Sequence, residues 1–113
     1  MSRRAATGLT RMIMRTWRGV VRRPDADRYA DYIRDTGFHE YGETPGNLGA
    51  WLLRRDEGET TEFVTLSLWE SRAAIVAFAG EDIEAAVLYP EDAEYLLGES
   101  TTTHHDVADV VTP

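Results

Sequence analysis

The chain has 113 residues, which is enough for one domain with one hydrophobic core and too few for two. Apolar residues make up 42% and charged residues 28%, a balance typical of a globular domain and not of collagen-like, disulfide-rich or disordered chains. Twenty acidic against twelve basic residues give a formal net charge of −8, which argues against a nucleic-acid partner, because phosphate binding needs positive charge. The sequence has no cysteine, so thiolate catalysis, disulfides and cysteine-ligated metals are excluded.

The sequence has no features typical of a membrane protein or a secreted protein. No apolar run approaches the ~20 residues of a membrane-spanning helix, so we expect no membrane partner. No signal peptide is recognisable, and the expected compartment is therefore the cytoplasm. Residues 1–11 are mostly small or polar and are expected to form a flexible N-terminal arm, which leaves residues 12–113 as one domain.

The first part of the domain predicts a strand followed by a helix. Residues 12–22 are rich in Met, Ile, Val and Trp with a rough two-residue alternation, which is typical of a strand. Asp25 is a suitable helix N-cap, and apolar residues then recur at helical spacing until Gly37, where we expect the helix to end. Residues 38–46 contain two glycines and one proline and predict a loop.

The middle of the domain predicts a hairpin and a second helix. Residues 48–55 and 62–69 flank a polar turn at residues 56–59, so we expect them to pair as antiparallel strands. A second, apolar helix is expected over residues 72–79, ending at Gly80.

The end of the chain completes a six-element pattern. Asp82 is expected to cap a further short helix that ends before Pro90, and residues 101–111 predict a last strand. The order strand, helix, strand, strand, helix, strand is that of the ferredoxin-like split β-α-β arrangement. We therefore expect an α+β fold whose four strands form one antiparallel sheet.

The third strand is apolar on both of its faces. One face carries Val64, Leu66 and Leu68, and the other carries Phe63, Thr65, Ser67 and Trp69. The two helices of this arrangement cover only one face of the sheet. We therefore expect a second copy of the chain to cover the other face, so that the protein is a homodimer.

Three segments resemble the antibiotic biosynthesis monooxygenase family. They are LWESRAAIVAFAG at residues 68–80, YPEDAEYLL at residues 89–97 and TPGNLGAWLLRR at residues 44–55. The resemblance covers about residues 12–110, and the Trp-x-Ser pattern that begins at Trp69 is its most specific part. It implies a dimeric α+β barrel, in which two four-stranded sheets face each other and each protomer holds a pocket between its sheet and its helices.

The family resemblance implies several possible activities. Members include cofactor-free oxygenases of polyketide-type phenols, haem-degrading enzymes, quinol monooxygenases and proteins with no known reaction. The haem-degrading branch combines a third-strand Trp, a first-strand Asn and a His in the following helical segment. Here Trp69 matches, but Trp17 stands at the Asn position, and Val87 lies in a segment, residues 85–89, without histidine. Haem degradation is therefore disfavoured, and we expect no cofactor and no metal.

Two adjacent histidines occupy the predicted last strand. Successive side chains of a strand point to opposite faces, so His104 and His105 cannot chelate one metal together. If His105 faces the helix-side pocket, it is the candidate base, because a histidine titrates near neutral pH. A shift of one residue in strand register would put His104 there instead. The alternative role is that of a partly buried structural histidine.

Trp69 is the candidate aromatic wall of the pocket. The residues expected to bind the substrate beside it are Phe63, Thr65, Ser67, Phe78, Trp17 and Tyr89. Aromatic walls with a few hydroxyl groups suit a flat aromatic ligand, because the rings stack and the hydroxyls orient it. The alternative is plain core packing of Trp69 against the second helix through Ile75 and Phe78.

Arg15 and Trp17 share one face of the predicted first strand. A guanidinium in a covered strand is costly to bury unpaired, so Arg15 or Arg18, which lie on opposite faces, is expected to meet a carboxylate or a ligand anion. A salt bridge across the dimer interface is the alternative. Tyr89, just before Pro90, either overhangs the pocket mouth or ends a helix and packs on the core.

Two functions are compatible with these residues. The first is a cofactor-independent monooxygenase acting on an aromatic or polyketide-like molecule, with His105, Trp69 and Arg15 as catalytic residues. As the resemblance implies, a base removes a phenolic proton, the anion reduces O₂, and the pocket stabilises the developing charge. The alternative is a non-catalytic ligand-binding or assembly module of the same fold. Motifs for nucleotide hydrolysis, zinc proteolysis and α/β-hydrolase chemistry are absent from the sequence.

Overall fold

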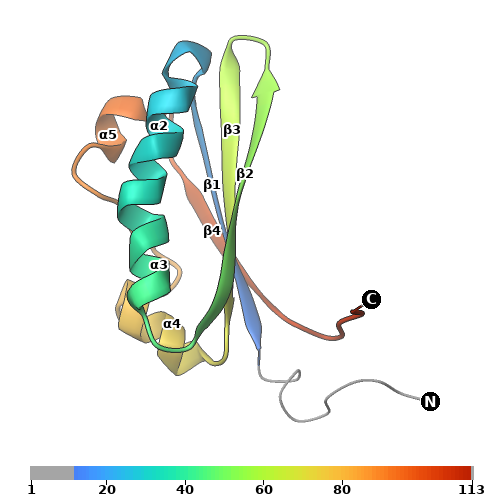
Figure 1. Ribbon diagram of the computed structural model, residues 1–113. Helices are drawn as coiled ribbons and strands as arrows, with labels where there is room; N and C mark the ends of the chain where they lie inside the picture. Colours follow the sequence, from blue (N-terminus) through green and yellow to red (C-terminus); the bar gives the residue numbers. More distant parts are fainter. Residues whose placement is uncertain (1–11, 113) are drawn as a thin grey trace.

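The computed structural model describes residues 12–112, which form one antiparallel sheet with helices on one of its faces (Figure 1). The strands, in the sheet order β2-β3-β1-β4, are β1 (Ile13–Arg22), β2 (Asn47–Glu57), β3 (Thr60–Trp69) and β4 (Thr101–Asp106). The helical elements are η1 (Arg23–Asp25), α2 (Ala26–Ile33), η2 (Arg34–Phe38), α3 (His39–Glu43), α4 (Arg72–Ala79) and α5 (Asp92–Tyr95). The predicted α+β fold is confirmed, while the expected N-terminal arm lies outside the described residues. No helix within residues 12–112 is long and apolar enough to cross a membrane.

Strand β1 lies in the middle of the sheet and pairs antiparallel with both β3 and β4. Its side chains alternate as the sequence predicts. Arg15, Trp17 and Val21 are buried under the helices, while Arg18 is exposed on the other face. This alternation places an arginine and a tryptophan, two residues apart, on the covered face of the central strand.

The first helix is longer than its sequence predicts. Helix α2 continues without interruption through the π-helical turn η2 and through α3, so residues 38–43, predicted as a loop, are helical. Gly37 lies inside the π turn and does not end the helix. Phe38 and Tyr41 pack into the core, and their burial outweighs the ~1 kcal/mol that a glycine costs in a helix. Asp25 makes no capping hydrogen bond and instead pairs with Arg28 at 2.7 Å.

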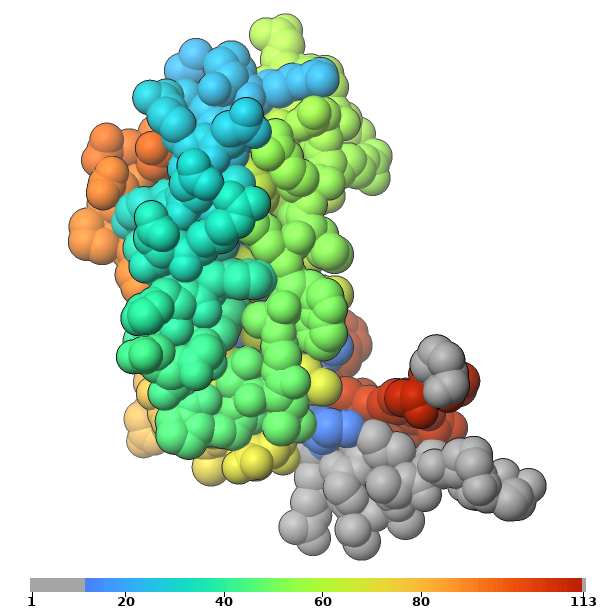
Figure 2. Space-filling model, in the orientation of Figure 1, coloured from blue at the N-terminus to red at the C-terminus, as the bar shows by residue number. Residues whose placement is uncertain are grey.

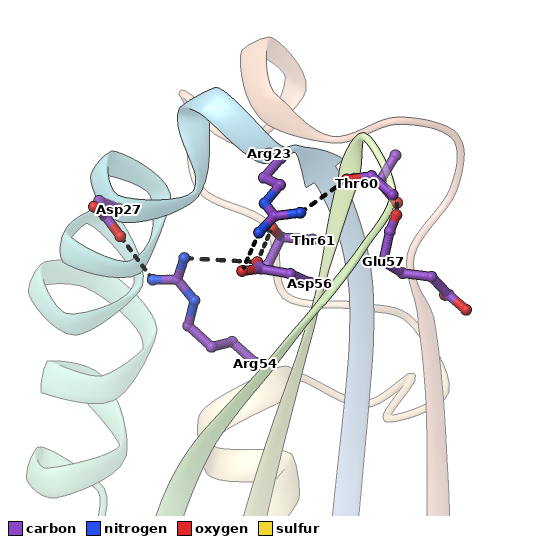
Figure 3. A network of polar contacts seen from close by, with 8 residues as sticks. Arg23, Asp27, Arg54, Asp56, Glu57, Thr60 and Thr61 are labelled. Atoms are coloured by element: carbon purple, nitrogen blue, oxygen red, sulfur yellow. Dashed lines mark hydrogen bonds and ion pairs between the residues drawn. The ribbon is translucent and has the colours of Figure 1, made fainter.

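The hairpin β2-β3 turns at Gly58, whose φ of 61° lies in the left-handed region that favours glycine. Its end is tied to the start of the helical layer by the exposed polar network of Figure 3. Arg54 contacts Asp27 of α2 at 2.8 Å, and Arg23 contacts Asp56 of β2 at 3.4 Å. Because these pairs are solvent-exposed, they fix geometry more than they add stability.

The chain between α4 and α5 departs from the prediction. Helix α4 has the expected bounds, with the Ser71 hydroxyl accepting from the backbone N–H of Ala74 and Gly80 ending the helix at a φ of 88°. The short helix expected between Asp82 and Pro90 is absent from these described residues, and α5 begins only after Pro90. The buried Arg15 side chain holds this segment instead, by donating to the backbone carbonyls of Ile83 and Ala85.

The last strand is shorter than expected. Strand β4 ends at Asp106, which pairs with Ile13 at the start of β1, so residues 107–111 have no further strand partner in β1. The first residue beyond the strand, Val107, still donates its backbone N–H to Met12 at 2.9 Å.

The core lies between the sheet and the helices in two aromatic clusters. One gathers around Trp17, Tyr29 and Phe63, and the other around Tyr41 and Trp69. In the space-filling view, helices α2 and α3 rest directly against the edge strand β2 (Figure 2). Both clusters are therefore covered on the helix side.

The other face of the sheet stays apolar and open within the chain. Val64, Leu66 and Leu68 of β3 are only half-buried there. Trp51 and Leu53 of β2, which pair with Leu66 and Val64, are 47% and 46% exposed. This is the two-faced apolar sheet that the sequence predicts.

Candidate functional site

A small cavity lies between the sheet, the long helix and the segment that follows α4. Its volume is about 40 Å³. Strands β1 and β3 supply Arg15, Trp17 and Thr65, the long helix supplies Tyr29, Ile33, Thr36, Gly37 and Tyr41, and the rest of the wall is Phe78, Val87, Tyr89 and Asp92. The residues that line the cavity therefore come from elements far apart in the sequence, between strand β1 and helix α5.

The volume of this cavity limits the size of the molecule that it can contain in the present conformation. A volume of about 40 Å³ accommodates a few water molecules at most and no aromatic ring system. An aromatic ligand enters only if a wall moves. The wall without regular secondary structure is residues 80–91, which run beside the long helix (Figure 1).

Arg15 connects the sheet to the segment over residues 80–91. Its guanidinium donates to the backbone carbonyls of Ile83 at 2.6 Å and Ala85 at 3.2 Å. It also lies 2.9 Å from His104 Nε2 and 5.8 Å from the centre of the Phe78 ring. Arg15 is 2% exposed and is the one arginine among the described residues that line the cavity.

The charge of Arg15 is not neutralised by a carboxylate at contact distance. Within residues 12–112, no Asp or Glu oxygen lies within 4 Å of this guanidinium, so the expected intramolecular partner is missing. Burial lowers the pKa of Arg15, while the nearby Tyr41 and Glu84 oppose that shift. The site therefore has a buried positive charge that faces a cavity.

His105 does not face this cavity, and the prediction that it does is wrong. The strand register pairs Arg15 with His104 and Met14 with His105, so His104 shares the covered face with Arg15. His105 is exposed on the opposite face. Once the register of β4 against β1 is fixed, strand alternation determines that His104, and not His105, faces the helices.

His104 lies behind Arg15 and does not line the cavity. Burial and the adjacent guanidinium lower the pKa of His104, and its Nε2 is placed to accept from Arg15. Its Nδ1 lies 3.4 Å from a carboxylate oxygen of Glu84. His104 thus supports Arg15 and is not exposed to a ligand.

Trp69, Phe63 and Ser67 do not line the cavity either, which corrects the prediction for these three residues. Trp69 is fully buried, and its indole N–H donates to the Ser67 hydroxyl at 2.9 Å. Its ring packs against Tyr41 and Phe78, which lie between it and the cavity. The alternative of plain core packing therefore describes Trp69, because strand alternation gives the face of a side chain but not its depth.

The other predicted pocket residues do meet at the cavity. Arg15, Trp17, Thr65, Phe78 and Tyr89 all line it. Of the hydroxyl groups, that of Thr65 lies 3.1 Å from the hydroxyl of Tyr41. The indole N–H of Trp17, in contrast, is buried with no acceptor in the described part of the chain.

Tyr89 holds the segment over residues 80–91 against the long helix. Its hydroxyl donates to the Glu40 carboxylate of α3, and its backbone N–H donates to Asp92 at 2.6 Å. Burial and the contact with Glu40 raise the pKa of Tyr89 well above its ordinary value. Its ring lies beside Gly37, where an added Cβ atom would meet it at 3.7 Å.

The helix side of the site was not predicted from the sequence. Tyr29 donates to the buried carboxylate of Asp92 at 2.8 Å, and both residues line the cavity. Thr36 and Gly37 of the π turn line it as well, and such turns are frequent at functional sites. The apolar residues keep their helical spacing beyond Gly37 as far as Tyr41. This spacing could have predicted the longer helix that forms this wall.

Comparisons with known proteins support the fold. No protein-family model matches the sequence, and no curated protein matches it either. A crystal structure of a protein of unknown function from Nitrosomonas europaea superimposes with a TM-score of 0.69 at 16% identity, over 94% of this chain and 98% of that one.

Two further solved structures have names that bear on activity. A Bacillus cereus protein provisionally named an antibiotic biosynthesis monooxygenase has a TM-score of 0.66 at 13% identity, over 91% of this chain and 99% of that one. SnoaB, a cofactor-independent oxygenase from Streptomyces nogalater, has a TM-score of 0.63 at 15% identity, over 91% and 99%. The chain therefore has the fold of the antibiotic biosynthesis monooxygenase structures. At these identities the likeness concerns the fold alone.

Proposed function

We propose that the protein is a cofactor-independent oxygenase that acts on an aromatic or polyketide-like small molecule in the cavity beneath the long helix. The observation that carries this proposal is Arg15, a buried guanidinium without a carboxylate at contact distance in residues 12–112, which lines the cavity. Such a group stabilises an anion formed from the substrate. The fold shared with SnoaB, named as a cofactor-independent oxygenase, supports the same function.

The proposed reaction uses the substrate as the source of electrons. A phenol or related acid loses a proton, and the resulting anion transfers electrons to O₂. One oxygen atom bonds to a ring carbon. The substrate loses one hydrogen from that carbon and one from its hydroxyl group, and these leave with the other oxygen atom as water. The balance needs no reductant other than the substrate.

Two residues of the cavity have distinct proposed roles. Arg15 stabilises the substrate oxyanion and the negative charge that develops on oxygen. Asp92 is the carboxylate that lines the cavity, and we assign it to accept the substrate proton in place of His105. One of its oxygens accepts from Tyr29 and the other from the Tyr89 backbone, so each keeps a free lone pair.

The second candidate is a non-catalytic ligand-binding module. It is favoured by the position of Trp69, which is packed in the core, and by the absence of both strand β4 histidines from the cavity wall. The two candidates differ in a measurable way, because only the oxygenase consumes O₂ when a ligand binds.

A homodimer formed through the open sheet face belongs to the same proposal. Half-exposed Trp51 and Leu53 continue the apolar row of Leu66 and Val64 on this face. A second copy placed on it covers these side chains, and specific interfaces of this kind bury more than ~1,000 Å² in total. The cavity lies on the other side of the sheet, so each protomer keeps its own site.

An oxygen-electrode screen tests the function. Polycyclic phenols and quinols are added to the protein in air-saturated buffer, and the products are analysed by mass spectrometry. The proposal expects O₂ uptake with a product that has gained one oxygen and lost two hydrogens. Binding of these compounds without any O₂ uptake favours the non-catalytic module.

A further inference from the structure

The positive charge of Arg15 has no counter-charge at contact distance inside the fold. Arg15 is 2% exposed, and no carboxylate oxygen of residues 12–112 lies within 4 Å of its guanidinium. Glu84, the acidic residue that acts on this charge, is largely exposed and contacts His104 instead. A buried cation without a nearby anion is unfavourable. The site therefore favours a small anion that enters from solution.

The guanidinium of Arg15 has two N–H groups to spare. Nη1 uses both of its N–H groups, one on the carbonyl of Ile83 and one on Nε2 of His104. Nη2 uses one N–H on the carbonyl of Ala85. One N–H of Nη2 and the N–H of Nε therefore have no acceptor in the described part of the chain. Nη2 is by definition the nitrogen on the Nε–H side, so the two spare donors come from adjacent nitrogens on one edge of the guanidinium.

This edge of Arg15 is not sealed off by the protein. Arg15 lines the cavity. Within residues 12–112, the side-chain polar atoms that are both enclosed and unpartnered include Nε1 of Trp17 but not Nε of Arg15. Because Nε of Arg15 also lacks a partner there, it escapes that set only by keeping accessible surface. A small molecule in the cavity can therefore reach the spare edge.

Two buried hydroxyl groups supply a further donor beside Arg15. The hydroxyls of Tyr41 and Thr65 lie 3.1 Å apart, and both residues line the cavity. Only one of their two protons lies between the oxygens, so the other has no acceptor among residues 12–112. Tyr41 acts on the charge of Arg15, and its ring packs against Phe78, over which the guanidinium lies. The spare hydroxyl proton and the spare edge therefore belong to the same part of the wall.

The cavity restricts the size and the charge of such an anion. Its volume of about 40 Å³ holds a few water molecules, and a planar anion of three or four non-hydrogen atoms takes roughly the same room. The carboxylate of Asp92 lines the same cavity and disfavours a dianion such as sulfate. Two donors on one guanidinium edge match two oxygen atoms of a planar anion better than they match a spherical halide.

We propose that the cavity binds a small, planar, monovalent oxyanion of the carboxylate type, such as formate, whose two oxygens accept from Nε and Nη2 of Arg15. The spare proton of the Tyr41 and Thr65 hydroxyl pair donates to the same anion. This site goes beyond the proposed oxygenase, because it concerns the cavity at its present volume, without an aromatic molecule and without O₂. A substrate anion that reaches Arg15 displaces the small anion.

Formate is the probe that tests the site, and chloride at the same ionic strength is the comparison. In ¹H–¹⁵N spectra the Nε–H of Arg15 gives its own resonance, which is assigned through its bonds to the side-chain carbons. Formate is expected to shift this resonance downfield and to saturate the shift, with half-saturation on the order of 1–10 mM, as for a well-held ligand of three non-hydrogen atoms. Chloride is expected to give no saturable shift.

Two matched variants test the two-donor edge. Arg15→Lys keeps the positive charge but removes the edge, so the affinity for formate is expected to fall about tenfold. The rise of the thermal unfolding midpoint with formate concentration measures this affinity. Arg18→Lys makes the same change on the other, exposed face of β1 and is expected to leave the affinity unchanged.

Two results overturn the proposal. One is a shift of the Arg15 Nε–H that does not saturate or that is equal for formate and chloride, because it would report ionic strength or unselective anion contact. The other is an unchanged formate affinity in a folded Arg15→Lys variant. If that variant does not fold, the spectra of the unaltered protein decide. Oxygen uptake tests the oxygenase separately, so the failure of one proposal is distinguishable from the failure of the other.

Discussion

The guanidinium of Arg15 lies 2.9 Å from Nε2 of His104, on the neighbouring strand of the sheet. A protonated imidazole cannot accept a hydrogen bond at that nitrogen, and its charge would repel the guanidinium. His104 is therefore neutral in the folded protein, with its pKa lowered by burial and by Arg15. A neutral histidine thus supports the buried cation that we propose to bind a substrate anion.

This pair predicts that acid destabilises the fold. The pKa of His104 is lower in the folded than in the unfolded chain, so the unfolded state binds the proton first as pH falls. Stability is lost from the ordinary histidine pKa of 6.5 downwards, towards the lowered folded value. Thermal unfolding between pH 5 and 8 measures this, and His104→Gln is expected to flatten the profile.

His105 provides the control for that measurement. His105→Gln, on the exposed face, is expected to keep the steep profile of the unaltered protein. A profile that flattens in the His105 variant and not in the His104 variant would reverse the assignment.

Tyr29→Phe is expected to destabilise the protein by about 1–3 kcal/mol, because the buried Asp92 carboxylate loses a hydrogen-bond donor. Urea unfolding measures the change. Tyr95→Phe is the matched control, since Tyr95 packs in the same cluster and its hydroxyl makes no side-chain hydrogen bond within residues 12–112. Equal losses in both variants would show that the Tyr29 hydroxyl contributes nothing.

Leu66→Arg is expected to convert the proposed dimer to a monomer. The side chain lies on the open sheet face opposite Trp51, where a second copy would bury the new charge without a partner. Sedimentation velocity at micromolar concentration measures the mass. Ala73→Arg adds the same charge at an exposed position of α4 and should leave the dimer intact. An unaltered protein that sediments as a monomer would refute the interface.

Tyr89→Phe is expected to speed ligand binding severalfold. The change removes the hydroxyl that joins the segment over residues 80–91 to Glu40 and keeps the ring beside Gly37, so this segment is expected to open more often. Stopped-flow binding of a phenol that the oxygen-electrode screen identifies gives the association rate. Leu88→Ala, an exposed neighbour in the same segment, serves as the control. An unchanged rate in Tyr89→Phe would mean that this contact does not restrain the wall.

The sheet was predictable from the sequence because strand alternation is a local property. The pattern around Val64 and Leu66 gives both faces of β3, and it also places Arg15 beside Trp17 on β1. The long helix was harder, since Gly37 is a local signal to stop and only tertiary burial of Tyr41 carries the helix through it.

The site depends on two features that a local sequence pattern does not reveal, namely the register of β4 and the side chains that pack over Trp69. Which histidine of β4 faces inward is decided by its register with β1, and this depends on how the preceding loop closes. Whether Trp69 touches a cavity depends on the side chains that pack over it, here Tyr41 and Phe78. The segment over residues 80–91 is placed by Arg15, through contacts of long sequence separation.

Oxygen uptake by Arg15 variants tests the central claim most directly. With a phenol or quinol that the unaltered protein oxidises, Arg15→Gln should lower the rate about 10²-fold or more, as expected for loss of a preorganised charge. Arg15→Lys should recover part of the rate, and His105→Gln should retain it in full, with folding of each variant checked by thermal unfolding. A folded Arg15→Gln variant that consumes O₂ at the unaltered rate, or a screen in which no phenol or quinol is oxidised, would contradict the account.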